Sequence, residues 1–293
     1  MFLQKSLALV ALVAVTGCTS PEERVDKHAR SAAKFIASYD FRRAWRELEK
    51  AKSVGIPCPQ ADAILGLMMA RRHDLAMAEN LLASAVSGLP SNHAARNNLA
   101  VIYLVSGRAP EALKLLEPSV KAGVRDSAMQ NNYGIALRVC GEYARARKAF
   151  EQAMRFNPRN ADATANHAMG LYLNNQLKDA VAAWETAVYI DANNPEAWAG
   201  LSIGRAAVGQ EAKAREAAMR AVIIDTTYVN QDMIVNVRNW PRKASVELSR
   251  LIRSIPQFRR GGMNSPIAMK VNGTAQFMED PLIEEARRLL AAR

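Results

Sequence analysis

The sequence predicts an all-α solenoid of six 34-residue units, each a pair of antiparallel helices. Alanine recurs at this spacing in every unit: Ala44, Ala78, Ala112, Ala146, Ala180 and Ala214. Seven residues later stands another small side chain: Ala51, Ala85, Ser119, Ala153, Ala187 and Ala221. The eighth residue of each unit is also small: Ala32, Gly66, Ala100, Gly134, Ala168 and Ser202. Because small side chains let helices approach closely, these three columns together predict the fold.

The register runs without insertion through six expected units: 25–58, 59–92, 93–126, 127–160, 161–194 and 195–228. Bulky residues at the twenty-fourth position of most units should fill the space between neighbours. Gly107, Gly141 and Gly209 fall between the two helices of their units, where a tight turn favours glycine. The pattern resembles the tetratricopeptide repeat (TPR) family. That resemblance implies a right-handed superhelical solenoid of six tetratricopeptide repeats with a C-terminal helical cap.

The chain after the repeats, residues 229–293, should form capping helices and a basic tail. Met233 to Trp240 could continue as a helix, and Pro241 begins an amphipathic helix that carries Leu248 and Ile252 on its apolar face. Residues 267–278 fit either a hairpin around Asn272-Gly273 or an extended tail. A final basic helix is expected after Pro281. These elements could cover the exposed end of the repeat array.

The first residues have the features of an export signal. A basic start is followed by an apolar run that is too short to span a bilayer, and small residues lead to Cys18. The sequence around Cys18 resembles the lipobox of bacterial lipoproteins, which implies acylation (palmitate) at Cys18. We therefore predict that residues 1–17 are a lipoprotein signal peptide and that residues 18–24 are a lipidated linker. The alternative is an ordinary cleaved signal that contains a cysteine. The two residues after the cysteine, Thr19 and Ser20, resemble those of lipoproteins that are sorted by default to the outer membrane.

Charge and cysteine content narrow the possible partners. Removal of a signal that contains Lys5 and no acid lowers the formal net charge from +11 to +10. Because the periplasm contains no nucleic acid, we do not expect this positive charge to bind nucleic acid. The possible partners are an acidic protein, an anionic glycan or lipid headgroups. A C-terminal basic cluster is either a docking patch or a solvated face: Arg238, Arg242, Lys243, Arg250, Arg253, Arg259 and Arg260. Cys58 and Cys140 lie too far apart in the array to bridge and are expected to be buried.

Catalytic chemistry finds no support in the sequence. The four histidines, His28, His73, His93 and His167, stand in different units without a second ligand at metal spacing. The sequence contains no glycine-rich phosphate loop and no nucleophile elbow. We therefore expect a protein that is not an enzyme and that has no catalytic residue, no metal site and no cofactor.

A binding groove has better support. The sixth residue of three consecutive units is asparagine, and the fifth is asparagine in two of them. An amide both donates and accepts hydrogen bonds, so a ladder of amides suits the backbone of an extended peptide. The predicted groove contains Asn97, Asn98, Val101, Asn131, Asn132, Ile135, Arg138, Asn166, Met169 and Tyr172. The alternative is that the asparagines contact solvent or a neighbouring unit, and that curvature partly buries the apolar residues.

Short stretches point to a narrower family. Residues 96–100 (Arg-Asn-Asn-Leu-Ala), 106–108 (Ser-Gly-Arg) and 115–118 (Leu-Leu-Glu-Pro) resemble the TadD-type lipoproteins of the tight-adherence (Flp) pilus. Residues 131–134 (Asn-Asn-Tyr-Gly) are similar to the pilotins of type IV pili. This resemblance implies a lipid-anchored scaffold on the periplasmic face of the outer membrane that binds a secretin or another pilus-assembly protein. The alternative is an envelope adaptor that brings proteases or peptidoglycan enzymes to substrates. The sequence leaves the oligomeric state open.

Overall fold

A computed structural model describes residues 20–38, 40–55 and 58–255 of the chain. The predicted signal peptide, the predicted lipidation site Cys18, the 267–278 segment and the predicted final helix lie outside the described residues. Residues Met1–Ile252 belong to one compact unit, and the chain from Arg253 onward belongs to another. Of the second unit, the structure describes residues 253–255.

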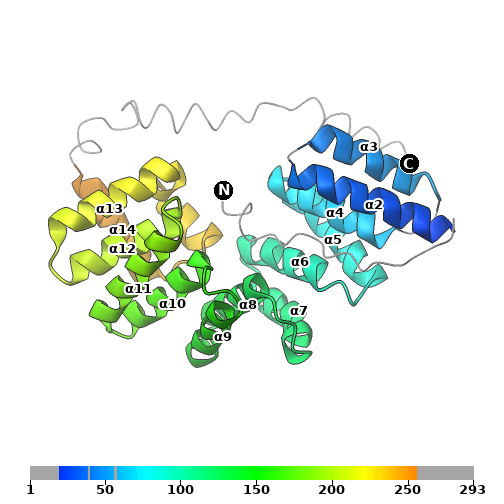
Figure 1. Ribbon diagram of the computed structural model, residues 1–293. Helices are drawn as coiled ribbons and strands as arrows, with labels where there is room; N and C mark the ends of the chain where they lie inside the picture. Colours follow the sequence, from blue (N-terminus) through cyan, green and yellow to red (C-terminus); the bar gives the residue numbers. More distant parts are fainter. Residues whose placement is uncertain (1–19, 39, 56–57, 256–293) are drawn as a thin grey trace. The chain divides into compact units, whose positions relative to one another are not determined.

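Helices arranged in consecutive pairs make up the described chain, as the repeat period predicts (Figure 1). The six pairs in the described residues are α2 (Pro21–Ala37) with α3 (Phe41–Lys52), α4 (Pro59–Arg71) with α5 (Leu75–Gly88), α6 (His93–Val105) with α7 (Ala109–Lys121), α8 (Ser127–Val139) with α9 (Tyr143–Phe156), α10 (Ala161–Leu173) with α11 (Leu177–Ile190), and α12 (Pro195–Ala207) with α13 (Glu211–Ile224). Each pair also packs against the next. The all-α solenoid prediction is confirmed.

The columns of small residues form the contacts between helices. All six alanines of the first column are buried, as are the six small residues seven positions later. Within two of the pairs, glycine at the eighth position lies under a bulky residue of the second helix. A Cβ on Gly66 would lie 2.6 Å from Leu82 Cγ, and one on Gly134 would lie 2.5 Å from Phe150 Cε1. Small side chains here are a packing requirement.

The turn inside each of the last five pairs contains one residue with a left-handed backbone at the fifteenth position. Glycine occupies it in three pairs, and His73 (φ 64°) and Asn175 (φ 60°) occupy it in the others. The next residue donates its backbone N–H to a carbonyl five residues earlier, as Glu142 does to Leu137 at 2.8 Å. This arrangement ends the first helix and reverses the chain.

The last residue of several units starts the next helix. Asn92, Asp126, Asn160 and Asn194 each accept a hydrogen bond from a backbone N–H three residues ahead, at 2.8–3.0 Å. These are N-caps, which satisfy otherwise unpaired N–H groups of the first helical turn. They fix the loops between units and so determine which polar side chains gather there.

The C-terminal segment differs in part from the expected continuous helix over 233–240. It contains a 3₁₀ turn η1 (Thr226–Val229), a π-helical turn η2 (Met233–Val237), and helix α14 (Arg242–Ser254). Between η2 and α14, Asn239 has a positive φ of 58°, so the chain cannot continue as a helix there. Helix α14 buries one face through Ala244, Leu248 and Ile252, as its amphipathic pattern predicts.

Candidate functional site

The asparagine ladder lies inside the array and joins neighbouring units. Asn132 Nδ2 on α8 donates to Asn97 Oδ1 on α6 at 2.9 Å. One unit further on, Asn166 Nδ2 on α10 donates to Asn131 Oδ1 on α8 at 3.0 Å. The sixth residue of one unit therefore binds the fifth residue of the unit before it. Of the two sequence interpretations, the contact with a neighbouring unit is the one that the structure contains.

Tryptophan ends this ladder at the last unit, where the sixth residue is Gly200. A Cβ on Gly200 would overlap the indole of Trp184, and one on Gly204 would lie 2.8 Å from Trp184 Cζ3. Trp184 is fully buried and also contacts the Tyr172 ring, with 5.9 Å between ring centroids. The bulky residue of the fifth unit thus takes the space that an amide would need.

All ten residues of the predicted groove are buried. Val101 belongs to the core cluster shared by the first units, and Ile135 to the cluster around α8. Asn97 and Asn132 have exposed fractions of 0% and 2%. The groove expected from the sequence is therefore not an open apolar surface along its whole length.

The chain's own C-terminal segment reaches the predicted groove at Arg138. Arg138 Nη1 donates to the backbone carbonyl of Asn239 at 2.7 Å. Asn239 Nδ2 donates to the backbone carbonyl of Leu104 on α6 at 3.1 Å. Val237 packs against the core cluster that contains Val101 and Val105. Residues 237–239 thus contact helices of the third and fourth units, more than one hundred residues earlier in the chain.

A buried polar cluster holds the same segment to the last unit. The Glu196 carboxylate on α12 accepts hydrogen bonds from the Tyr228 hydroxyl and from Trp240 Nε1. Arg238 Nη1 donates to the Tyr228 hydroxyl at 3.1 Å, and Nη2 forms an ion pair with Asp225. The Arg238 guanidinium also stacks 4.1 Å from the centre of the Tyr228 ring. Arg238 is therefore a buried structural residue and contributes nothing to an exposed basic patch.

Burial and charge set the ionisation of this cluster. Burial raises the pKa of Glu196, because its charged form loses water, although Arg238 and the two donors oppose this shift. Burial would also raise the pKa of Asp225, but the Arg238 charge and the hydrogen bonds from Thr227 outweigh it, and the pKa is lowered. Burial raises the pKa of Tyr228 well above its usual range, so the hydroxyl stays protonated and acts as a donor.

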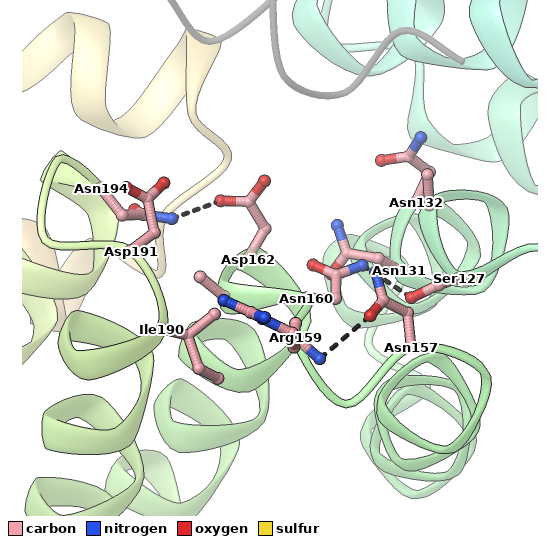
Figure 2. Close-up of a pocket in the computed structure, with 12 residues that line it drawn as sticks. Ser127, Asn131, Asn132, Asn157, Arg159, Asn160, Asp162, Ile190, Asp191 and Asn194 are labelled. Carbon is pink, nitrogen blue, oxygen red and sulfur yellow. Dashed lines mark hydrogen bonds between the residues drawn. The ribbon is translucent and has the colours of Figure 1, made fainter. Parts of the chain in front are cut away.

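An open pocket of about 380 Å³ remains beside the ladder, at the start of the first helices in the last three units. Figure 2 shows Asn131, Asn132, Ser127 and Asn157 on one side, and Asp162, Asp191 and Asn194 on the other. The lining residues are Ser127, Ala128, Asn131, Asn132, Asn157, Arg159, Asn160, Ala161, Asp162, Ile190, Asp191 and Asn194. Of the predicted groove residues, Asn131 and Asn132 line this pocket.

Several polar groups of the pocket already have structural partners. Asn160 Nδ2 donates to Ser127 Oγ at 2.7 Å, and Asn194 Nδ2 donates to Asp162 Oδ1 at 2.6 Å. Within the described part of the chain, Asn131 Nδ2 donates no hydrogen bond and Asn132 Oδ1 accepts none, and both residues line the pocket. One donor and one acceptor of neighbouring amides therefore remain available to a ligand backbone.

The loop residues of this pocket were not expected from the sequence. Asn160 and Asn194 stand at the last position of their units, and Asn157 and Asp191 stand three residues before them. A column of Asn or Asp at a 34-residue spacing was the available signal. The simplest interpretation of such a column is helix capping, which Asn160 and Asn194 do perform. Only the packing of successive loops shows that these residues also surround a pocket.

Other kinds of site find no support in the described residues. No group of three His, Cys, Asp or Glu side chains lies there that could hold a metal ion. Among the helices that the structure describes, none is both long and apolar enough to cross a membrane. Cys140 is exposed, whereas Cys58 is buried, so the expectation that both are buried is wrong for Cys140. Cys140 lies at the turn between α8 and α9, where the helix end leaves the side chain uncovered.

Comparison with known proteins agrees with the helix arrangement. The tetratricopeptide repeat family model matches residues 69–131. No curated protein matches the chain in sequence. The structure of pilF from Pseudomonas aeruginosa is similar over 71% of this chain and 95% of its own, with 17% identity and a TM-score of 0.59.

Two further solved structures share the arrangement. PilW, described as a widely conserved type IV pilus biogenesis factor, is similar over 68% of this chain and 92% of its own, with 16% identity and a TM-score of 0.58. A chain of the APC/C hetero-tetramer Cut9–Hcn1 is similar over 79% of this chain and 43% of its own, with 15% identity and a TM-score of 0.62. At such identities the likeness concerns the fold alone. The chain folds as a solenoid of tetratricopeptide repeats.

Proposed function

We propose that this protein is a non-enzymatic scaffold that binds an extended segment of another protein in the pocket lined by Asn131 and Asn132. The observation that carries this proposal is a pair of amide atoms, Asn131 Nδ2 and Asn132 Oδ1, on residues that line the pocket; neither atom has a hydrogen-bond partner among the described residues. An amide that donates and an amide that accepts suit a peptide backbone, which offers both groups at each residue. The rest of the pocket is polar and open, which suits a segment that keeps part of its hydration.

The proposed setting is the periplasmic face of the outer membrane of a Gram-negative bacterium. Acyl chains on Cys18 would supply residence at the membrane, since several chains on one residue bind far more stably than one. The proposed partner is a secretin or another component of a tight-adherence or related pilus, whose assembly or localisation the scaffold assists. The likeness of fold to PilW supports this choice.

Site-specific photo-crosslinking in the native envelope tests the partner. A photoreactive residue replaces Arg159, which lines the pocket and has an exposed side chain, and the matched control replaces the exposed Arg220 on α13. A pilus-assembly protein should crosslink at position 159 and not at 220. Crosslinks to a protease or a peptidoglycan enzyme would instead favour the envelope-adaptor function. Equal crosslinking at both positions would contradict a role for the pocket.

Substitution of Cys18 tests the membrane anchor separately. The Cys18→Ser chain should lose labelling by a palmitate analogue and move from the membrane to the soluble fraction. The wild-type chain is the control. Continued lipid labelling of the variant would rule out acylation at this cysteine.

A further inference from the structure

Arg138 is a buried cation that lacks a close anion. Its side chain lies on α8 and is 7% exposed. Its hydrogen bond goes to a neutral group, the Asn239 carbonyl, and Nε has no partner in the described structure. No carboxylate of the described residues forms an ion pair with it; Glu196 acts on it only from a distance, and directs its oxygens to Tyr228 and Trp240. Burial lowers the pKa of Arg138 to about 10, so the side chain stays charged at neutral pH.

The contact at Arg138 joins parts of the array that are remote in sequence. We call residues 237–239 the clasp. Arg238, within the clasp, pairs with Asp225, and the adjacent Trp240 bonds to Glu196, so the clasp is held near the last unit. On the other side, its contacts to the third and fourth units are the two Asn239 hydrogen bonds and the packing of Val237. This second attachment contains no ion pair among the described residues, whereas the first contains the Arg238–Asp225 pair, so it is the part that we expect to open without loss of the C-terminal cluster.

The pocket and Arg138 lie on one face of the same helix. Asn131 and Arg138 are seven residues apart on α8, which is about two helical turns. Ile135 lies between them on that face, and it is buried. A protein segment that binds in the pocket and continues along α8 therefore reaches Arg138, where the clasp now lies.

We propose that a carboxylate of the bound protein segment replaces the Asn239 carbonyl on Arg138, so that partner binding opens the clasp. This inference rests on the function proposed for the pocket. A carboxylate forms charge-assisted and often bidentate hydrogen bonds with a guanidinium, which are stronger than one bond to a neutral carbonyl. The carboxylate could be a side chain of Asp or Glu or the C-terminus of the partner; its chemistry is the same.

A peptide library supplies the test, because the partner segment is not identified. The mature chain with Cys18→Ser is used to select binders from random dodecapeptides with free C-termini. Each binder is then synthesised with an amidated C-terminus, or with Asp and Glu replaced by Asn and Gln, and the Kd is measured by fluorescence anisotropy. Neutralising one carboxylate should weaken binding at least about tenfold, the effect of a lost charge-assisted hydrogen bond. Which of the two changes does so identifies the source of the carboxylate.

Variants of the protein locate the effect. Arg138→Met should weaken binding of the acidic peptide to the same extent, and neutralising the peptide should then have little further effect. Arg155→Met, which removes one charge from the exposed surface of α9, should leave Kd unchanged. Asn239→Gly keeps the positive φ and loses the bond to Leu104, so it should tighten binding several-fold. Hydrogen exchange at residues 237–240 should speed up when the peptide binds.

The outcomes separate this inference from the proposed function. Peptides that bind with no dependence on their carboxylates or on Arg138 would overturn the inference and leave the pocket's function intact. If neither the wild-type chain nor Asn239→Gly binds any peptide, both proposals are wrong. If Arg138→Met does not fold, as circular dichroism would reveal, Arg138→Lys and the neutralised peptides decide the question. Lysine keeps the charge but loses the bidentate geometry.

Discussion

Asn132 on α8 donates a hydrogen bond of 2.9 Å to Asn97 on α6, a residue that lies 35 positions earlier in the chain. The bond crosses from one unit to the next and both side chains are buried. Asn166 and Asn131 repeat the same contact one unit further on. Asn132 Nδ2 and Asn131 Oδ1 thus serve the array, and the other amide atoms of the same two residues, Asn132 Oδ1 and Asn131 Nδ2, remain for a ligand. Because of this double role, a substitution in the ladder can change both the stability of the array and its binding of a ligand.

The buried amide pair should contribute to stability. Asn97→Ala and Asn132→Ala are each expected to lower the free energy of unfolding by about 1–3 kcal/mol, because the remaining amide loses its buried partner. The double variant should lose less than the sum of the two. Urea denaturation measures all three, with the exposed Asn193→Ala as a control that changes stability by less than about 0.5 kcal/mol. Strict additivity would argue against the bond. Binding losses in such variants must be compared at equal folded fractions.

Two helical glycines with opposite surroundings make a matched test of packing. Gly200→Ala on α12 should lower the free energy of unfolding by about 1–3 kcal/mol, since the new Cβ would overlap the Trp184 indole in a filled core. Gly170→Ala on α10 meets no atom within 4 Å and should raise it by about 0.5–1 kcal/mol. Thermal unfolding of both variants checks the prediction. Equal effects of the two substitutions would contradict the packing at Trp184.

The Arg238–Asp225 ion pair should make stability depend on pH. The folded-state pKa of Asp225 is lowered, so its contribution is present above the unfolded value, near 3.9, and is lost as pH falls through the folded value. In Arg238→Met the cation no longer opposes the effect of burial, so the pKa of Asp225 should be higher than in the wild-type chain. The variant should be about 3 kcal/mol less stable at pH 7.

Carboxyl NMR titration of Asp225 in the wild-type and Arg238→Met chains measures the two pKa values directly. The Arg242→Met variant, which changes an exposed arginine on α14, is the control. An Asp225 pKa that is the same with and without Arg238 would show that the ion pair does not set it.

Cys140 should react with thiol reagents only slowly near neutral pH although the residue is exposed. Partial burial of the thiol, within a residue that is exposed as a whole, and the nearby Glu142 charge raise its pKa, so little thiolate is present at pH 7. As long as the pH is below the pKa, the labelling rate should rise about tenfold for each unit by which the pH is increased, because the thiolate fraction rises by that factor. Glu142→Gln should speed labelling at pH 8, because it removes the second cause of the shift.

Alkylation followed by mass spectrometry measures this rate in a chain with Cys18→Ser. Cys140→Ser should leave only the much slower reaction of the buried Cys58. A rate at pH 7 equal to that of a free thiol in a short peptide would contradict the raised pKa.

Much of the fold could be read from the sequence because units in a solenoid contact only their neighbours, which leaves a period in the chain. The buried alanine columns and the glycines of the turns are examples. The asparagine column was also visible in the sequence, but the residue of the neighbouring unit that each asparagine contacts was not. Asn132 bonds the fifth residue of the previous unit, and this offset depends on how successive helices are rotated against each other.

The sequence by itself determined the repeat, the helical hairpins and the residues that let them pack, since each follows from local contacts repeated at 34 residues. Only the tertiary structure decided which part of the predicted groove stays open. The bonds of Asn239 to Arg138 and to Leu104 span 101 and 135 residues. Such contacts occur once and leave no period, because they depend on where the folded array brings the C-terminal segment. The covered cation at Arg138 is a consequence of that placement, whereas the open pocket at Asn131 and Asn132 results from the packing of successive loops between units.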